Sequence, residues 1–221
     1  MTAAGPISSS GPRAHATRRH GDEMGQRLTT ETPAHATADA SGVSARAWQQ
    51  WVIIDTETTG LTKDDRIVEV AAIAVEAATM TEVDRFVTLL QPDRDTGATE
   101  VHGISEEMVR HSPRFADIAR EFARFLDGRV LVAHNLRFDQ GFLEREFELA
   151  GLPLDLGRGF CTWRHGTMMT LAKSCEAHDI TLDGAHRAAA DAEATMQLLT
   201  FLSQRHTADL EPVRAPEQTL F

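Results

Sequence analysis

The stretch Trp51-Val52-Ile53-Ile54-Asp55-Thr56-Glu57 places two carboxylates directly after a short apolar run. The run is rich in β-branched residues, which predicts a buried strand. Side chains two positions apart on a strand point to the same face, so we expect Asp55 and Glu57 to be neighbours. Neighbouring carboxylates repel each other unless a positive charge, commonly a divalent cation, lies between them. A solvent-exposed strand end is the alternative interpretation.

The pattern around this strand predicts an α/β fold. Two more apolar stretches follow after short turns, which favours antiparallel pairing of three strands. Helical and strand patterns then alternate, so we expect a mixed sheet flanked by helices. The predicted strands after the first cover 66–75, 83–90 and 130–134, and the predicted helices begin after Ser105, at Pro113, near Phe138, near Met168 and at Arg187.

A second polar cluster, His134-Asn135-Leu136-Arg137-Phe138-Asp139, follows the predicted fourth strand. The carboxyl ends of strands are where ligands bind in open α/β sheets. Asp139 is expected in the first turn of the next helix. There a carboxylate also complements the helix dipole, which is the alternative explanation for it.

A third cluster, His186-Arg187-Ala188-Ala189-Ala190-Asp191, opens the last predicted helix. Five residues of an ideal helix turn through about 500°, which leaves about 140° between the first and last side chains. His186 and Asp191 therefore approach each other only if His186 precedes the helix and Asp191 faces the sheet. An Asp on an apolar sheet must be paired or bind a metal.

Together, the pattern Asp-x-Glu, Asp, His-x4-Asp resembles the DEDDh family of 3′–5′ exonucleases. The three motifs correspond to residues 55–61, 134–139 and 186–192, and Val101-His102-Gly103-Ile104-Ser105 matches a segment common in the epsilon proofreading subunits of bacterial DNA polymerase III. The similarity extends over about residues 48–205. It implies a ribonuclease H-like fold: three antiparallel strands, then parallel strands, flanked by helices.

The resemblance also implies the roles of the acidic residues. Asp55 would bridge two divalent cations, Mg²⁺ or Mn²⁺, with Glu57 and Asp191 on one ion and Asp139 on the other. Two such ions about 3.5–4 Å apart activate a water, hold the scissile phosphate and stabilise the leaving oxygen. His186 would be the general base. Its place ahead of a helix N-terminus disfavours the imidazolium form.

The same resemblance implies residues for substrate binding. The terminal nucleotide would lie among Thr58, Leu61, His102 and Phe138, with Leu61 as a wedge between the last two bases. Core packing is the alternative for Leu61 and Phe138. Aromatic residues make up only 6% of the chain, so we expect a short footprint of nucleic acid.

Charge and composition restrict the function further. The 221 residues carry a formal net charge of −11, which excludes a protein that holds nucleic acid by bulk positive charge. No segment approaches the roughly 18 apolar residues of a membrane span, so no membrane contact is expected. Cys161 and Cys175 form no CxxC pair, as expected for a protein of the reducing cytoplasm, here bacterial and associated with the nucleoid.

The chain divides into three parts. Residues 1–47 contain neither Phe nor Trp and are expected to form a disordered tail. Residues 48–206 would form the exonuclease domain, followed by a tail over 207–221. The end of that tail, Ala215-Pro216-Glu217-Gln218-Thr219-Leu220-Phe221, resembles peptides that dock on the bacterial sliding clamp, although Gln218 lies one position late. A chain end of no consequence is the alternative.

The sequence thus predicts a metal-dependent 3′–5′ exonuclease that releases nucleoside 5′-monophosphates from single-stranded or frayed DNA 3′ ends, in proofreading or repair. A DNA polymerase or the sliding clamp would be its partner. One alternative is an exoribonuclease like RNase T or oligoribonuclease. Another is a non-catalytic member that binds nucleic acid or a polymerase, although the presence of all four acids and His186 argues against it.

Overall fold

The computed structural model describes residues 50–166 and 168–205, and it places five strands in one sheet of order β3-β2-β1-β4-β5. The antiparallel strands are β1 (Gln50–Thr58), β2 (Ile67–Glu76) and β3 (Thr81–Leu89). The strands β4 (Val130–Ala133) and β5 (Phe160–Cys161) extend the sheet in parallel beside β1. The predicted mixed sheet is confirmed.

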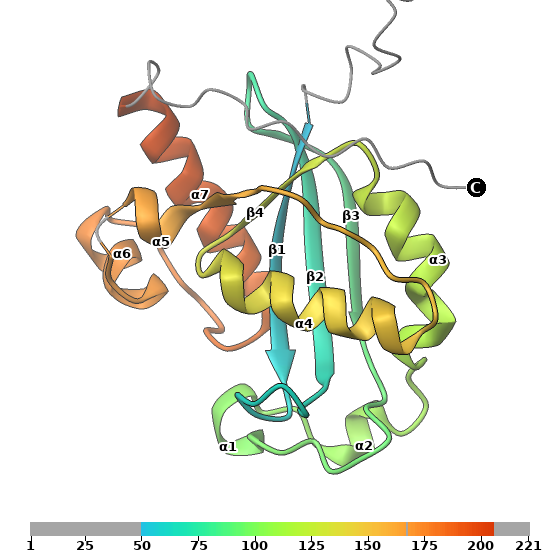
Figure 1. The fold of residues 1–221 in the computed structure, drawn as a ribbon. Coiled ribbons are helices and arrows are strands. Elements are labelled where there is room, and N and C mark those ends of the chain that lie inside the picture. The colour runs from blue at the N-terminus through green and yellow to red at the C-terminus, as the bar shows by residue number, and fades with distance from the viewer. Residues whose placement is uncertain (1–49, 167, 206–221) are drawn as a thin grey trace, which may run out of the picture. The chain divides into compact units, whose positions relative to one another are not determined.

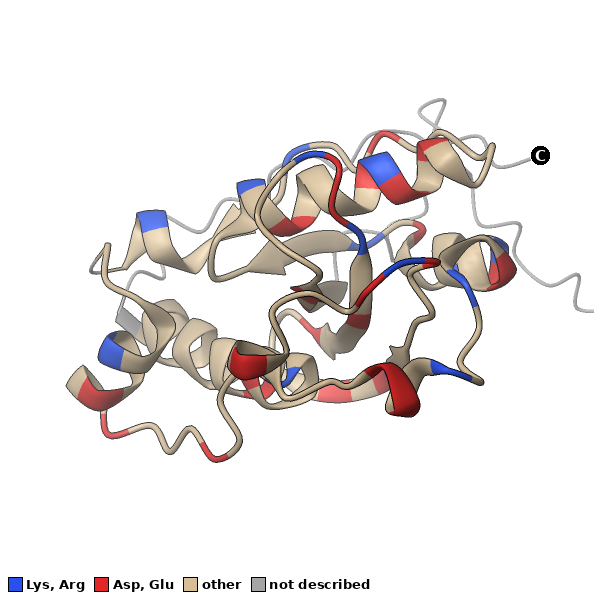
Figure 2. Ribbon diagram, turned by 90° about the horizontal axis from the view of Figure 1, so that it is seen from below, with Lys and Arg blue, Asp and Glu red and all other residues tan. Residues whose placement is uncertain are grey.

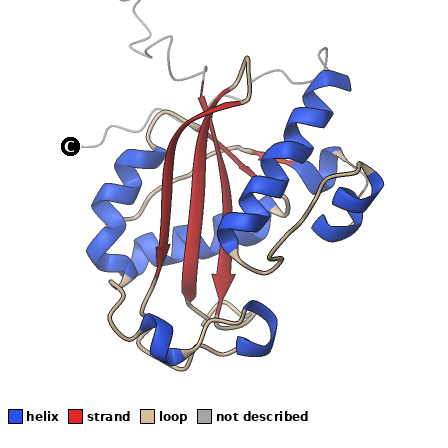
Figure 3. Cartoon of the chain, turned by 180° about the vertical axis from the view of Figure 1, so that it is seen from behind, coloured by secondary structure: helices blue, strands red, loops and turns tan. Residues whose placement is uncertain are grey.

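Helices cover both faces of this sheet (Figures 1 and 3). One face carries α3 (Phe115–Leu126) and α4 (Leu136–Leu149), and the other carries α7 (Ala188–Arg205). Four short helices complete the described residues: α1 (Thr99–His102), α2 (Glu106–Val109), α5 (Thr162–His165) and α6 (Leu171–Ala177). None of the helices in the described ranges is long and apolar enough to cross a bilayer.

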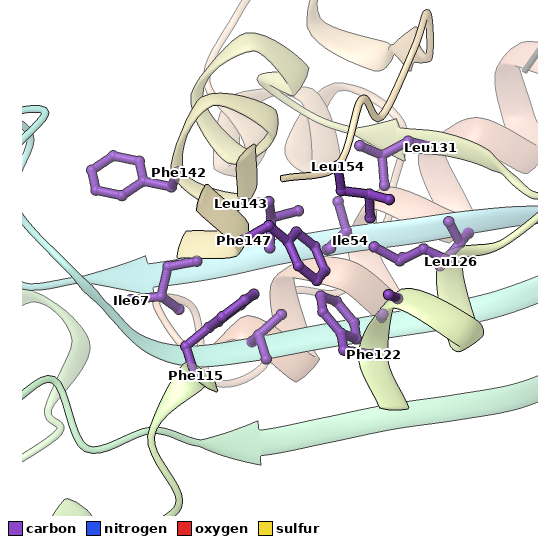
Figure 4. Close-up of a cluster of buried hydrophobic side chains, with 14 of the residues drawn as sticks. Ile54, Ile67, Phe115, Phe122, Leu126, Leu131, Phe142, Leu143, Phe147 and Leu154 are labelled. Carbon is purple, nitrogen blue, oxygen red and sulfur yellow. The ribbon is translucent and has the colours of Figure 1, made fainter. Parts of the chain in front are cut away.

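Strand β1 separates two hydrophobic clusters because its side chains alternate between the faces. Val52 and Ile54 belong to the cluster under α3 and α4, where Phe122 and Phe147 stack with ring centroids 6.1 Å apart (Figure 4). Trp51 and Ile53 belong to the cluster under α7. That helix contributes the small residues Ala188 and Ala192, which allow it to pack closely on β1 and β2.

The structure adds three elements that the sequence pattern does not predict, namely α1, β5 and α5. Each has two to four residues, too few for a hydrophobic period to show. Cys161 and Cys175 are both buried and form no disulfide. The proposed tails, 1–47 and 207–221, lie outside the described residues.

Candidate active site

Three carboxylates meet at the end of β1. Asp55 and Glu57 follow Trp51 and Ile53 on alternate positions, so all four point toward α7. Asp191 comes from the first turn of α7. One oxygen from each of Asp55, Glu57 and Asp191 lies within 4.8 Å of the others, which makes this a candidate metal site.

The fourth predicted acid, Asp139, approaches from the opposite face of the sheet. It lies in the first turn of α4 and is 4% exposed. The Thr56 hydroxyl, which points toward α4 between the two acids of β1, donates a 2.9 Å hydrogen bond to Oδ1 of Asp139. We name Asp55, Glu57, Asp139 and Asp191 the carboxylate cluster.

Burial and mutual repulsion make this cluster reluctant to ionise. Burial, followed by the charges of Asp139 and Asp191, raises the pKa of Asp55 well above its ordinary value. Burial also raises the pKa of Glu57 to about 7, with Asp191 as the next cause. The pKa of Asp139 rises to about 7 through burial, against the opposing hydrogen bond from Thr56. Bound divalent cations would offset the repulsion directly.

His186 and Asp191 are joined through the backbone. The His186 N–H donates a 3.1 Å hydrogen bond to Oδ2 of Asp191. This bond opposes the effect of burial, which raises the pKa of Asp191. His186 precedes α7 and has a φ of +64°, which a non-glycine residue seldom adopts, and its side chain is exposed. The predicted placement of His186 on the loop and Asp191 toward the sheet agrees with this geometry.

Oδ1 of Asp191 is buried and has no hydrogen-bond partner among the described residues. A buried carboxylate oxygen normally has a partner. Its position beside Asp55 and Glu57, with oxygen ligands only, fits a hard divalent cation. The fold and this acidic cluster therefore indicate the use of a divalent metal.

An ion pair between a half-exposed arginine and a buried glutamate holds the start of α7 against the sheet. Glu69 of β2, which is opposite Glu57 in the β1–β2 register, is buried. Its carboxylate accepts 3.0 and 2.6 Å hydrogen bonds from Nε and Nη2 of Arg187, and another of 3.0 Å from the Ala188 N–H. The pair therefore fixes the backbone between His186 and Asp191.

The residues predicted to bind the terminal nucleotide have different environments. Thr58 is buried and donates a 2.6 Å hydrogen bond to the Gly60 carbonyl, whereas Leu61 is 84% exposed. This exposure excludes core packing for Leu61. Phe138 is partly buried against the core, with its ring centroid 4.8 Å from that of Phe142, so the packing alternative applies to it at least in part.

His102 is buried near the end of β1. Its Nδ1 accepts a 3.0 Å hydrogen bond from the Ile104 N–H, and its Nε2 has no partner among the described residues. The segment that leads to α1 reaches β1 because Gly97 has a φ of +71° and lacks a side chain. A Cβ there would be 1.8 Å from the Thr59 carbonyl oxygen. Burial lowers the pKa of His102, which favours the neutral imidazole.

Sequence reasoning missed Thr56, Glu69 and Arg187 as parts of this site. Glu69 carried a signal, because it is the one acid inside the apolar run 67–75. Arg187 lay within a quoted motif, but nothing in the motif pairs it with a residue 118 positions earlier. Thr56 carried no signal of its own, because only the acids on either side of it suggested metal binding.

Figure 2 views the molecule from the end at which β1 stops, and acidic and basic segments surround this end of the sheet.

A family model described as Exonuclease matches residues 52–199. The DNA polymerase III subunit epsilon of Treponema pallidum is 34% identical over 164 residues, which cover 69% of this chain and 75% of that protein.

A PolC-type DNA polymerase III of Halalkalibacterium halodurans is 37% identical over 68% of this chain, but the match covers 11% of that polymerase. The chain therefore spans about a tenth of the length of such relatives. Among solved structures, exonuclease X in complex with 5′ overhanging duplex DNA has a TM-score of 0.59 and 26% identity, over 73% of this chain and 95% of that one. The chain belongs to the Exonuclease family and has the ribonuclease H-like fold of the DEDDh 3′–5′ exonucleases.

Proposed function

We propose that the chain is a metal-dependent 3′–5′ exonuclease that hydrolyses phosphodiester bonds at DNA 3′ ends and releases nucleoside 5′-monophosphates in proofreading or repair. The observation that supports this most strongly is the approach of Asp55, Glu57 and Asp191 within 4.8 Å in a member of the Exonuclease family. A non-catalytic binding protein would have no use for four acids whose pKa values are raised together.

In this proposal Asp55, Glu57 and Asp191 would hold one cation, and Asp55 and Asp139 would hold a second. Mg²⁺ is the expected ion and Mn²⁺ the substitute. Divalent cations at such a site lower the pKa of water and stabilise charge on the phosphate. His186 accepts the proton of the attacking water at its imidazole. The hydrogen bond from the His186 N–H to Asp191 holds the His186 backbone beside this acid, which supports the assignment.

The terminal nucleotide lies at the end of β1 in this proposal. Exposed Leu61 wedges between the last two bases. Phe138 and the His102 imidazole contact the terminal sugar and base in this proposal. The hydrogen bond from Thr58 to the Gly60 carbonyl fixes the backbone between β1 and Leu61.

The test uses the full chain with single-stranded DNA, a mispaired primer and a short RNA, each in Mg²⁺ and in EDTA. We expect degradation from the 3′ end of the DNA substrates, release of mononucleotides, and no reaction in EDTA. Preferential degradation of RNA would establish the exoribonuclease alternative. No degradation of any substrate in Mg²⁺ or Mn²⁺ would contradict the proposal.

A polymerase or clamp partner is a separate part of the proposal. The net charge of −11 disfavours unaided tracking along DNA, so we propose that a polymerase, or the sliding clamp bound by residues 215–221, brings the enzyme to 3′ ends in the bacterial nucleoid. These residues lie outside the described ranges. Deletion of 216–221 should abolish clamp binding in a direct binding assay, and unchanged affinity would refute this docking role.

A further inference from the structure

A pocket of about 760 Å³ lies beside the first half of α4, away from the carboxylate cluster. The segment that returns from α4 to α5 closes its other side, and Figure 1 shows this segment running back toward α5. The polar and aromatic residues that line it include Asn135, Arg137 and Gln140 on one side and Arg158, Trp163 and Arg164 on the other.

The arginines of this pocket differ from most others in the structure. Seven described arginines form ion pairs with carboxylates: Arg66, Arg85, Arg94, Arg110, Arg114, Arg145 and Arg187. In the described ranges, Arg137, Arg158 and Arg164 form none. Three guanidinium groups without a carboxylate partner therefore make this pocket locally positive in a chain of net charge −11.

An aromatic surface lies among these cations. Trp163 packs partly against the hydrophobic cluster under α3 and α4 and also lines the pocket. Its backbone N–H donates a 2.9 Å hydrogen bond to the His134 carbonyl just before α4. Gln140 bridges the two sides, because its Nε2 donates to the Gly157 carbonyl at 3.0 Å and to Oε1 of Glu144 at 2.7 Å. Glu144 is the one acidic residue lining the pocket, so the arginines outnumber it.

Guanidinium groups around a partly exposed tryptophan match the chemistry of single-stranded nucleic acid. Arginines bind phosphates, and an aromatic ring stacks on a base of any sequence. We infer that this pocket, named here the arginine pocket, binds single-stranded DNA a few nucleotides upstream of the 3′ end. This inference rests on the proposed exonuclease function and assigns a second contact region to its substrate.

The position of the pocket predicts a dependence on substrate length. Arg137 and Asp139 are two residues apart on α4, so their side chains leave the helix about 200° apart. A strand that ends at the carboxylate cluster must pass the N-terminal end of α4, about 10–12 Å across, before it reaches the pocket. A dinucleotide is too short for this path, whereas a strand of six or more nucleotides can follow it.

The test compares the wild type with the R137Q/R158Q/R164Q variant on single-stranded DNA of two, four, six and ten nucleotides. We expect the increase in KM to grow with length, reaching about tenfold or more for the longest strands, with little change in kcat. The slope of log affinity against log salt should decrease by about 2 for the loss of three phosphate contacts. A W163A variant should weaken binding of the long strands about tenfold through lost stacking.

A control variant removes two exposed arginines from α3, one charge fewer than the pocket variant. Arg120 and Arg124 also form no ion pair in the described structure, so R120Q/R124Q makes the same kind of charge change away from the pocket. We expect this variant to match the wild type at every length. An equal effect of both variants would show a nonspecific charge effect and would overturn the inference.

Binding measured without turnover separates this inference from the proposed function. Fluorescence anisotropy of a labelled ten-nucleotide strand in EDTA needs no catalysis, and we expect the pocket variant to bind about tenfold more weakly than the wild type. If the wild type degrades no DNA but still binds the strand about tenfold more tightly than the pocket variant, the proposed function is wrong and the inference about the pocket stands. If the wild type degrades DNA and the pocket variant binds and cleaves every length normally, the arginine pocket is refuted.

Discussion

Two sets of carboxylates in this protein, one fully buried and the other mostly half-buried, have opposite surroundings. Glu146 accepts bonds of 2.7 and 2.8 Å from Arg66, and Glu69 accepts comparable bonds from Arg187. Each also accepts a backbone N–H. Within the described ranges no Arg or Lys forms an ion pair with the carboxylate cluster, and the pKa values of its four members are raised. The comparison separates acids whose charge an arginine neutralises from acids whose charge no described residue neutralises.

The largest expected effect is on activity. Asp55→Asn keeps the shape of the side chain and removes its charge, so we expect kcat to fall by at least about a thousandfold as several kcal/mol of transition-state stabilisation are lost. Mg²⁺ should raise the Tm of the wild type more than that of the variant. Near wild-type activity in D55N, with an unchanged circular dichroism spectrum, would remove Asp55 from the site.

Arg187→Gln and Arg66→Gln form a matched pair that tests the two ion pairs of buried glutamates. Each leaves a buried glutamate without its cation, so denaturant unfolding should show a loss of about 1–3 kcal/mol for both. We expect only R187Q to lower kcat as well, because Glu69 and Arg187 hold the backbone beside His186. R187K should recover part of kcat. Equal loss of kcat in R66Q and R187Q would contradict this division.

The pH dependence of stability should reveal the unpaired acids. The pKa values of Glu57 and Asp139 are about 7, above their ordinary values. The folded state therefore binds more protons than the unfolded state between about pH 4 and 7, and the metal-free protein loses stability as pH rises through that window. In EDTA at pH 8, Asp139→Asn should raise the Tm by about 2–8 °C.

The direction of these changes in Tm decides whether the Asp139 carboxylate lacks a stabilising partner in the metal-free protein. A metal-free Tm that increases between pH 5 and 8, or a lower Tm in D139N, would mean that Asp139 is stabilised as a carboxylate by a group other than a cation. Asn can still accept the hydrogen bond from Thr56, so the substitution changes mainly the charge.

The smallest effect on stability is expected at Leu61. It is 84% exposed, so Leu61→Ala should change the free energy of unfolding by less than about 0.5 kcal/mol. We expect a severalfold higher KM for DNA, since the variant removes the wedge but leaves the carboxylates. An unchanged KM would show that Leu61 does not contact the substrate.

The sequence predicted the sheet and its main helices because their hydrophobic periods run over many residues. The apolar run of β1 and the pattern of α3, with Phe115, Ile118 and Phe122 buried, are examples. The same periodicity predicted that Asp55 and Glu57 share a face. It could not predict β5, which has two residues and exists because Phe160 and Cys161 pair with β4.

What the sequence determined by itself was the identity of the acids and the order of the elements that carry them, since both depend on local spacing. Only the tertiary structure decided which acids are neutralised, because Glu69 and Glu146 find their arginines 118 and 80 residues away. It also gathered Arg137, Arg158 and Arg164 around one pocket, for no local pattern connects α4 with the segment that folds back beside it.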